Sequence, residues 1–582
     1  MPTDRVQAAI IHAASSGEPV DFTTPSDPPN MPDYGDDGFW ADRSIDGEWL
    51  SEYATNGEAR PHRRGIDIRG LRIRNGLDVQ CALIDYRLAL TRCQLGPGTI
   101  NLEEATTRTL VLTGTCCAAL VLRRTQIAGD VLLDMGFAAT GGVRLQGATI
   151  GGRLSCQGGT FINPGGDAIH ADNAKITGDL VLGNGFAATG GVRLQGATIG
   201  GQLSCRGGKF TNPDRDAIHA DNAKITGDLF LGNGFAATGG VRLLGATIGG
   251  QLSCRGGTFT NPGGKALYAD SVKVTESLFL DGGFAATGEV CLDGATIGGN
   301  VTCEGGKFTN PDGDALSTDG MRVARSLSLD AGFAPTGTVR LRAASAGTLV
   351  DDRACWPTRM ILDGFEYRNL ISPDRGWRVR SHWLRAQVDY RPEAYAQLVT
   401  VYRASGDERA ARKILMERHN VLLHPPDHWP SKVSGRLGPL RRRARWVGRQ
   451  ILRFTIGHGY EPWRILGLVI PLVAALSLWF SVARHHDTLV PTDGAAQVTA
   501  STCTAHYRCV QPFVLALDSV IPLVEFGQRS AWRPDQSRHS ATWYRDGRWL
   551  VAGVWIATAL GWIFAALVVS SFSQVTKKGL TE

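Results

Sequence analysis

Cysteine recurs at a fixed interval in the middle of the chain, where a row of thiols could form disulfides or bind metal ions. Cys156, Cys205, Cys254 and Cys303 are spaced 49 residues apart, and the pattern Ala-x-Ile-x-Gly-x-Leu occurs twice within the interval. One 49-residue unit therefore predicts two stacked coils, which would separate neighbouring cysteines by about 9 to 10 Å. Because a disulfide requires Cα atoms within about 7 Å, we expect reduced cysteines that alternate with leucines in the core.

A column of aspartates raises the possibility of a calcium site, because some β-helix enzymes bind calcium with acidic side chains. Its members are Asp172, Asp221, Asp270 and Asp319, again 49 residues apart. The oxygen ligands of one calcium ion must lie within about 5 Å of one another, whereas these carboxylates would be spread evenly along the stack. We therefore expect each aspartate to hold the backbone of its own turn.

Two other motifs match functional sites only in part. His170 and His219 are in register, but two coils apart they cannot bind one metal ion, so a role at the surface or in a turn is expected. Gly183-Asn-Gly185-Phe-Ala-Ala188 matches the dinucleotide fingerprint, which requires a helix after it, yet Thr-Gly-Gly and another short strand follow. The sequence therefore predicts no catalytic residue, no cofactor and no metal site.

The 49-residue period predicts the fold class. The segments between its glycines are short and alternate apolar with polar residues, and none has the 3.6-residue period of a helix. Apolar residues make up 43% of the chain, which excludes wholesale disorder. We predict a mainly β protein in which residues 65–350 form a parallel β-helix of about eleven coils, roughly 50 Å long. Residues 1–64 would cap its first coil.

The sequence changes character after the repeats. Residues 383–423 have helical periodicity and predict a hairpin, similar to one tetratricopeptide unit, within a helical cap at 351–430 that covers the strand edges. A basic juxtamembrane segment at 431–464 leads into an apolar stretch at 465–483, and a second apolar stretch occupies 549–572. Each stretch is long enough to span a bilayer as a helix. The basic residues outside the two spans predict cytoplasmic termini, including the tail at 573–582.

The basic segment predicts a contact with anionic lipid head groups. A run of arginines that ends at an apolar span is better explained by lipid than by DNA, so nucleic acid is not an expected partner. The arginines expected to face the lipid are Arg441, Arg442, Arg443, Arg445 and Arg449.

The loop at 484–548 would then be extracytoplasmic. There Cys503 and Cys509 are candidates for a disulfide, which persists in an oxidising compartment. An apolar segment in the loop is interrupted by Asp518 and Glu525, so we predict a re-entrant or interfacial segment instead of a third span. Two spans around such a segment are similar to the pore module of two-span cation channels, although glutamate replaces a filter glycine.

Several motifs outside the repeats carry a resemblance to a known group. They are Arg43-Ser-Ile-x-Gly-Glu-Trp-Leu50, Tyr390-Arg-Pro-x2-Tyr-x-Gln-Leu398 and Gly459-Tyr-Glu-Pro-Trp463. With the repeats, they make the chain similar to uncharacterised bacterial membrane proteins of the actinobacterial type that carry pentapeptide-like or β-helix repeats. Some of these are labelled membrane-associated oxidoreductase, but the sequence offers no redox centre.

These observations predict a non-catalytic scaffold anchored in the bacterial cell membrane by two spans. Its rod would present a regular surface to an unknown protein or polymer, or to further copies of the chain. Two alternatives remain open, a membrane-associated oxidoreductase and a two-span channel-like protein with a re-entrant loop.

Overall fold

The computed structural model describes residues 3–27, 35–56, 61–422, 426, 429, 462–493, 498–500, 508–521, 524–540 and 542–578, without the side chains of residues 462, 463 and 570–578. The chain divides into two compact units, Met1–Asp407 and Glu408–Glu582, and each is described by itself.

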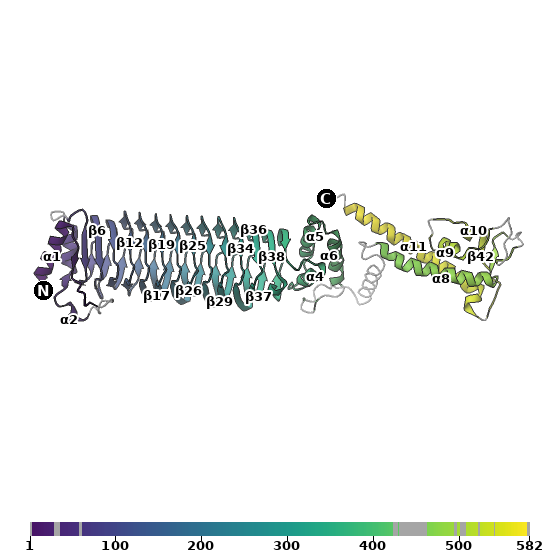
Figure 1. Ribbon diagram of the computed structural model, residues 1–582, viewed down its shortest axis with the longest axis horizontal. Coiled ribbons are helices and arrows are strands. Elements are labelled where there is room, and N and C mark those ends of the chain that lie inside the picture. The colour runs from purple at the N-terminus through teal and green to yellow at the C-terminus, as the bar shows by residue number, and fades with distance from the viewer. Residues whose placement is uncertain are drawn as a thin grey trace. The chain divides into compact units, whose positions relative to one another are not determined.

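The first unit is a parallel β-helix of about 13 coils, which confirms the predicted fold class. Figure 1 shows two rows of strands running along this rod. The expected number of about eleven coils is too low, because parallel pairing continues beyond residue 350 to the strand β40 at Glu366–Ile371.

Two sheets form the walls of the rod, and neighbouring strands in each come from successive coils. Sheet A contains β1 (Val20–Asp21), β3 (Ile66–Arg69), β6 (Leu83–Thr91), β8 (Thr106–Val111), β11 (Gln126–Ile127), β12 (Val131–Leu132), β15 (Thr149–Ile150), β16 (Leu154–Ser155), β18 (Lys175–Ile176), β19 (Leu180–Val181), β21 (Thr198–Ile199), β22 (Leu203–Ser204), β24 (Lys224–Ile225), β25 (Leu229–Phe230), β27 (Thr247–Ile248), β28 (Leu252–Ser253), β30 (Lys273–Val274), β31 (Leu278–Phe279), β33 (Thr296–Ile297), β34 (Val301–Thr302), β36 (Arg322–Leu329), β38 (Ser345–Asp351) and β40. Sheet B contains β5 (Leu77–Asp78), β7 (Thr99–Asn101), β9 (Cys116–Cys117), β10 (Ala119–Val121), β13 (Ala138–Ala139), β14 (Val143–Arg144), β17 (Thr160–His170), β20 (Ala187–Arg193), β23 (Lys209–His219), β26 (Ala236–Arg242), β29 (Thr258–Tyr268), β32 (Ala285–Cys291), β35 (Lys307–Ser317), β37 (Ala334–Arg340) and β39 (Arg359–Ile361).

Glycine allows the chain to turn sharply between the short strands. In the Gly-Ala-Thr-Ile motif, Gly196 has a φ of +65°, and its N–H donates to the carbonyl of Asp221 on the next coil. A residue with a Cβ adopts this left-handed conformation at a cost, so the repeated glycine fixes the corner of the coil.

The core columns confirm that 49 residues make two coils. Cys156 N–H donates to the carbonyl of Val181, which precedes Leu182, and Leu182 N–H donates to Ser204, which precedes Cys205. Cysteine and leucine therefore alternate from coil to coil along the column. Cys205 is 1% exposed and forms no disulfide, as expected for a small apolar core residue.

A ladder of phenylalanines forms a second core column, which the sequence pattern had not led us to expect. Nine rings stack through sheet B, one on each successive coil, with neighbouring ring centroids 5.0 to 5.5 Å apart. They belong to Phe137, Phe161, Phe186, Phe210, Phe235, Phe259, Phe284, Phe308 and Phe333. Offset aromatic contacts at this distance add to the burial of each ring, so the ladder couples every coil to its neighbours.

Helices close the two ends of the rod. The N-terminal cap contains α1 (Thr3–Ser16), α2 (Asp37–Trp40) and α3 (Gly47–Thr55), with the strand β2 (Ser44–Asp46) paired to β4 (Arg72–Arg74). At the other end, η1 (Arg353–Cys355), α4 (Trp377–Arg385) and α5 (Pro392–Ala404) follow the last coils. These helices shield strand edges that would otherwise be free to pair with other chains.

A buried ion pair joins the last coils to the C-terminal cap. Arg380 on α4 is fully buried and donates two hydrogen bonds to the carboxylate of Asp351, at the end of β38. The indole N–H of Trp356 donates to the same carboxylate at 3.0 Å, and the Arg380 guanidinium lies 5.1 to 5.2 Å from the rings of Trp356 and Trp383.

The second unit is mainly helical. Its elements are α6 (Glu408–Val421), η4 (Pro462–Ile465), α8 (Leu466–His485), β41 (Leu489–Pro491), α9 (Pro512–Val520), α10 (Gln528–Ala531), β42 (Trp532–Pro534), η5 (Trp543–Arg545) and α11 (Gly547–Lys578). Two of its helices, Leu466–His485 and Gly547–Val569, are long and apolar enough to span a membrane. The short helix α9 packs against both α8 and α11.

Candidate functional site

The aspartate column lies where the chain leaves sheet B, and each member holds the turn of the following coil. The carboxylates of Asp172 and Asp221 accept hydrogen bonds from the backbone N–H groups of Gln195 and Leu244, both at 3.1 Å. The expectation that each aspartate holds its own turn is therefore wrong. Stacking at about 4.8 Å places the backbone 23 residues later directly within reach of the carboxylate.

In the regular coils an arginine of the next coil also pairs with this aspartate. Arg193 lies 2.7 Å from Asp172, and Arg242 lies 2.8 Å from Asp221. The histidines predicted to have turn roles join the same clusters, since His170 lies 2.9 Å from Asp172. Each repeat therefore carries an aspartate whose charge is matched locally.

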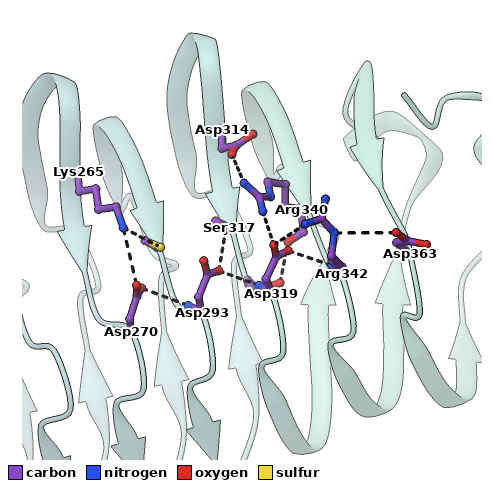
Figure 2. A network of polar contacts seen from close by, with 11 residues as sticks. Lys265, Asp270, Asp293, Asp314, Ser317, Asp319, Arg340, Arg342 and Asp363 are labelled. Carbon is purple, nitrogen blue, oxygen red and sulfur yellow. Dashed lines mark hydrogen bonds and ion pairs between the residues drawn. The ribbon is translucent and has the colours of Figure 1, made fainter. Parts of the chain in front are cut away.

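The pattern breaks at the third repeat, where four corresponding positions change together. Cys291 stands in the column of Arg193 and Arg242, and Asp293 in that of Gln195 and Leu244. Lys265 replaces an aspartate of the protruding loop, and Glu289 replaces a glycine. Figure 2 shows the resulting cluster, in which Lys265 reaches toward Asp270 and a sulfur atom.

The cation in this cluster comes from the loop instead of the next strand. Lys265 Nζ lies 3.4 Å from Cys291 Sγ and 3.7 Å from the carboxylate of Asp270. Lys265 Nζ also lies 3.9 Å from the centre of the Tyr268 ring, which occupies the histidine position of the first two repeats. The lysine thus replaces the missing arginine as the partner of Asp270.

The polar contacts continue from this cluster into the next coils (Figure 2). Asp293 accepts hydrogen bonds from the Ser317 hydroxyl at 2.7 Å and from the backbone N–H of Asp319 at 2.8 Å. Asp319 pairs in turn with Arg340, and Arg342 lies 3.7 Å from Asp319. A continuous chain of charged groups therefore crosses the surface of the rod at this end of the repeats.

The cluster disfavours a reactive thiolate. Burial, together with the carboxylates of Asp270 and Asp293, raises the pKa of the Cys291 thiol above its ordinary value. Although partial burial opposes it, the carboxylate of Asp270 and the hydrogen bond that Lys265 donates to Cys291 raise the pKa of the Lys265 ammonium. At neutral pH the thiol stays protonated and the amine stays charged, so neither is activated as a nucleophile.

Among the described residues, this cluster also has the ligand types and spacing that could hold a metal ion. Ligand atoms of Asp270, Cys291 and Asp293 all lie within 4.8 Å of one another. A metal bound there would have to displace the Lys265 ammonium and deprotonate the thiol. The geometry is therefore that of a polar contact between coils, in which Lys265 pairs with Asp270.

A second repeated feature is a loop that protrudes from sheet B. Asn163, Asn212, Asn261 and Asn310 each donate a side-chain hydrogen bond of 2.8 to 2.9 Å to the carbonyl four residues later. Each bond closes one loop, and the residues at the loop tips, such as Pro213 to Arg215, are exposed. The rod thus presents one similar loop every second coil.

The predicted sites of the second unit are described in part. Cys509 is disulfide-bonded, whereas Cys503 lies outside the described residues, so their pairing stays a prediction. The expected lipid-facing arginines (Arg441, Arg442, Arg443, Arg445 and Arg449) also lie outside the described residues.

The two acidic residues of the predicted re-entrant segment have different surroundings. Asp518, on α9, is buried, and its carboxylate accepts backbone hydrogen bonds from Phe526, Gln528 and Arg529 at 2.8 to 3.2 Å. Glu525 is exposed. Asp518 therefore fixes the turn that carries Glu525, and the re-entrant position of this segment stays a prediction.

Sequence reasoning missed the cluster around Cys291 because each changed residue is unremarkable alone. The signal was present in the repeat alignment, where Lys265, Glu289, Cys291 and Asp293 all depart from their counterparts within one pair of coils.

The chain matches no protein-family model, no curated protein and no solved structure.

Proposed function

We propose that this protein is a non-catalytic, membrane-anchored scaffold whose rod binds a protein partner through the protruding loops of sheet B. The observation that carries the proposal is the repeated asparagine clamp, which gives four loops the same closed geometry at two-coil intervals. The spacing is about 9 to 10 Å along a continuous parallel ladder. A partner that contacts several loops would gain affinity because the loops are already ordered.

The two long apolar helices support a membrane attachment for this scaffold. In the bilayer, the arginine-rich segment that precedes the first of them would contact anionic lipid head groups. A bacterial cell membrane with both termini in the cytoplasm is the arrangement that the distribution of basic residues favours.

In-cell crosslinking of the full chain, followed by mass spectrometry, tests the proposal. We expect a partner whose crosslinks map to the loops, and we expect them to disappear when the tip residues 164–165, 213–215, 262–263 and 311–312 are removed. A control with Gln126→Ala and Arg325→Ala, two exposed residues of sheet A, should keep the partner. Retention of the partner by the trimmed rod would refute the loops as the binding surface.

A second candidate function is a two-span channel-like protein. It is favoured by α9, which lies between the two apolar helices in the sequence and packs on both, and by the clamp of Asp518 on the turn after α9. Single-channel recording in planar bilayers tests it, with Glu525→Gln expected to change the conductance. Electrically silent bilayers containing reconstituted protein would contradict it.

A further inference from the structure

Sheet A carries an exposed column in which lysine and threonine alternate from coil to coil. The column consists of the first residues of one strand from each of eight successive coils, which are in parallel register and all exposed; the strands are β15, β18, β21, β24, β27, β30, β33 and β36. In order they are Thr149, Lys175, Thr198, Lys224, Thr247, Lys273, Thr296 and Arg322. We call this column, with the neighbouring Thr177, Thr226 and Thr275, the lysine–threonine face.

The cations of this face have no carboxylate partner among the described residues. Lys175, Lys224, Lys273 and Arg322 take part in no ion pair or side-chain hydrogen bond there, whereas the arginines of the aspartate column are paired. Some surface cations elsewhere on the rod are matched, as Arg242 is to an aspartate at 2.8 Å. Four positive charges in line, spanning about 29 Å over six coils, therefore remain available to an external anion.

Four carboxylates lie around the face, and none belongs to it. Asp179 and Asp228 on the adjoining turn are part-buried, and each accepts a backbone hydrogen bond from the next coil at 2.9 Å. Glu276 is an exposed carboxylate beside Lys273 and Thr275, and the exposed Glu366 continues the column two coils beyond Arg322. The residues that define the lysine–threonine face thus include four cations and no carboxylate.

The shape and composition of the face select among anionic partners. Its two columns contain lysine, arginine, threonine, glycine and alanine, with no aromatic ring on which a base could stack. The long loops protrude from sheet B, and the strands of this face are joined by tight turns, so no element projects that could enter a nucleic-acid groove. A planar array of head groups requires neither stacking nor a groove.

We propose that the lysine–threonine face is a docking surface for anionic membrane lipids. The chain has two helices apolar enough to hold it at a bilayer, and the inference rests on that proposed attachment. The lysines and Arg322 would contact phosphate groups, and the threonine hydroxyls would donate hydrogen bonds between them. The rod would then rest on the membrane through sheet A and leave the loops of sheet B available to a partner.

Lysine acetylation of the full chain in nanodiscs tests the proposal, because the rod contains its own controls. Lys209 and Lys307, on sheet B, are also exposed and have no ion pair among the described residues. In nanodiscs with anionic phosphatidylglycerol, we expect acetylation of Lys175, Lys224 and Lys273 to slow about threefold or more relative to neutral phosphatidylcholine. Lys209 and Lys307 should react equally in both, and about 0.5 M salt should remove the difference.

Several results would overturn the proposal. One is that the three face lysines are acetylated at the same rate in both lipids. Another is that anionic lipid protects Lys209 and Lys307 as strongly as it protects the face lysines. Protection that appears in neutral nanodiscs only when single-stranded DNA is added would assign the face to nucleic acid instead. Failure of the chain to enter nanodiscs would refute the membrane anchoring on which the inference rests. The crosslinking experiment on the loops of sheet B tests only the proposed scaffold function.

Discussion

Replacing Arg380 with methionine should strongly destabilise the C-terminal end of the rod. The guanidinium is fully buried, and its loss leaves the carboxylate of Asp351, itself 3% exposed, with the indole N–H of Trp356 as its remaining cap donor. Removing one partner of a buried ion pair costs about 3 to 5 kcal/mol, because the other charge stays buried without compensation. The loss should be local, since the pair joins the last coils to the cap.

Hydrogen exchange of the full chain, read at the amides of β38 and β40, measures this cost as the free energy of local opening. Changing Asp351 to asparagine in the Arg380→Met background removes the stranded charge and should recover most of the loss. Arg378→Met, an exposed neighbour on α4, should change protection by less than about 0.5 kcal/mol. If the single and double variants lose equal protection, burial of an uncompensated charge is not the cause.

Three further predictions concern the core columns and the second unit. Phe210→Ala should cost about 3 to 5 kcal/mol of unfolding free energy in thermal or urea unfolding, because it leaves a cavity and breaks ring contacts at 5.0 and 5.3 Å. Thr211→Ala on the exposed side of the same strand should stay within about 0.5 kcal/mol, and equal losses would refute the ladder's role. Burial raises the pKa of the Cys205 thiol in the folded chain. The free energy of unfolding is therefore undiminished at pH values below the thiol pKa of the unfolded chain, about 8.5. Above that pH it falls by about 1.4 kcal/mol per pH unit for each such thiol. Stability measured against pH should therefore fall less steeply for Cys205→Ala, and an unchanged slope would contradict this. Asp518→Ala should speed amide exchange at residues 526–529 about tenfold or more, because three N–H groups lose their acceptor; unchanged exchange would count against the clamp.

The architecture was predictable because it depends on spacing alone. A column repeated every 49 residues, with a half-repeat inside it, admits one stacking in which Cys205 and Cys254 are two coils apart, and the register confirms it. The phenylalanine ladder was equally present in the sequence, but four of its nine members follow Gly-Gly-Lys or Gly-Gly-Thr, whereas the other five stand in the Gly-Phe-Ala motif. Recognising it required the pairing of Phe210 with Ala188 on the neighbouring strand.

The direction of the aspartate contacts could not be read from the sequence. Turn statistics favour a hydrogen bond in which the aspartate carboxylate accepts from a backbone N–H of its own turn, because residues two positions apart are close in any fold. In a stack, residues 23 to 26 positions apart are as close, and the N–H of Gln195 competes successfully for Asp172. Long-range neighbours of this kind are created by the fold, so local propensity gives the wrong partner.

The regularity of the rod also determines how its surface should be interpreted. Where the repeats have no role beyond stacking, an aspartate pairs with an arginine of the next coil, as Asp221 does with Arg242. In the cluster around Lys265, Asp270 keeps a cationic partner although the arginine is missing, so the departure from the pattern does not require a ligand. The lysine–threonine face lacks this charge matching, because its cations recur in every unit and form no ion pair with a carboxylate among the described residues. An unmatched charge that recurs with the repeat is therefore the stronger indication of an external anion, because stacking alone gives no reason to retain it.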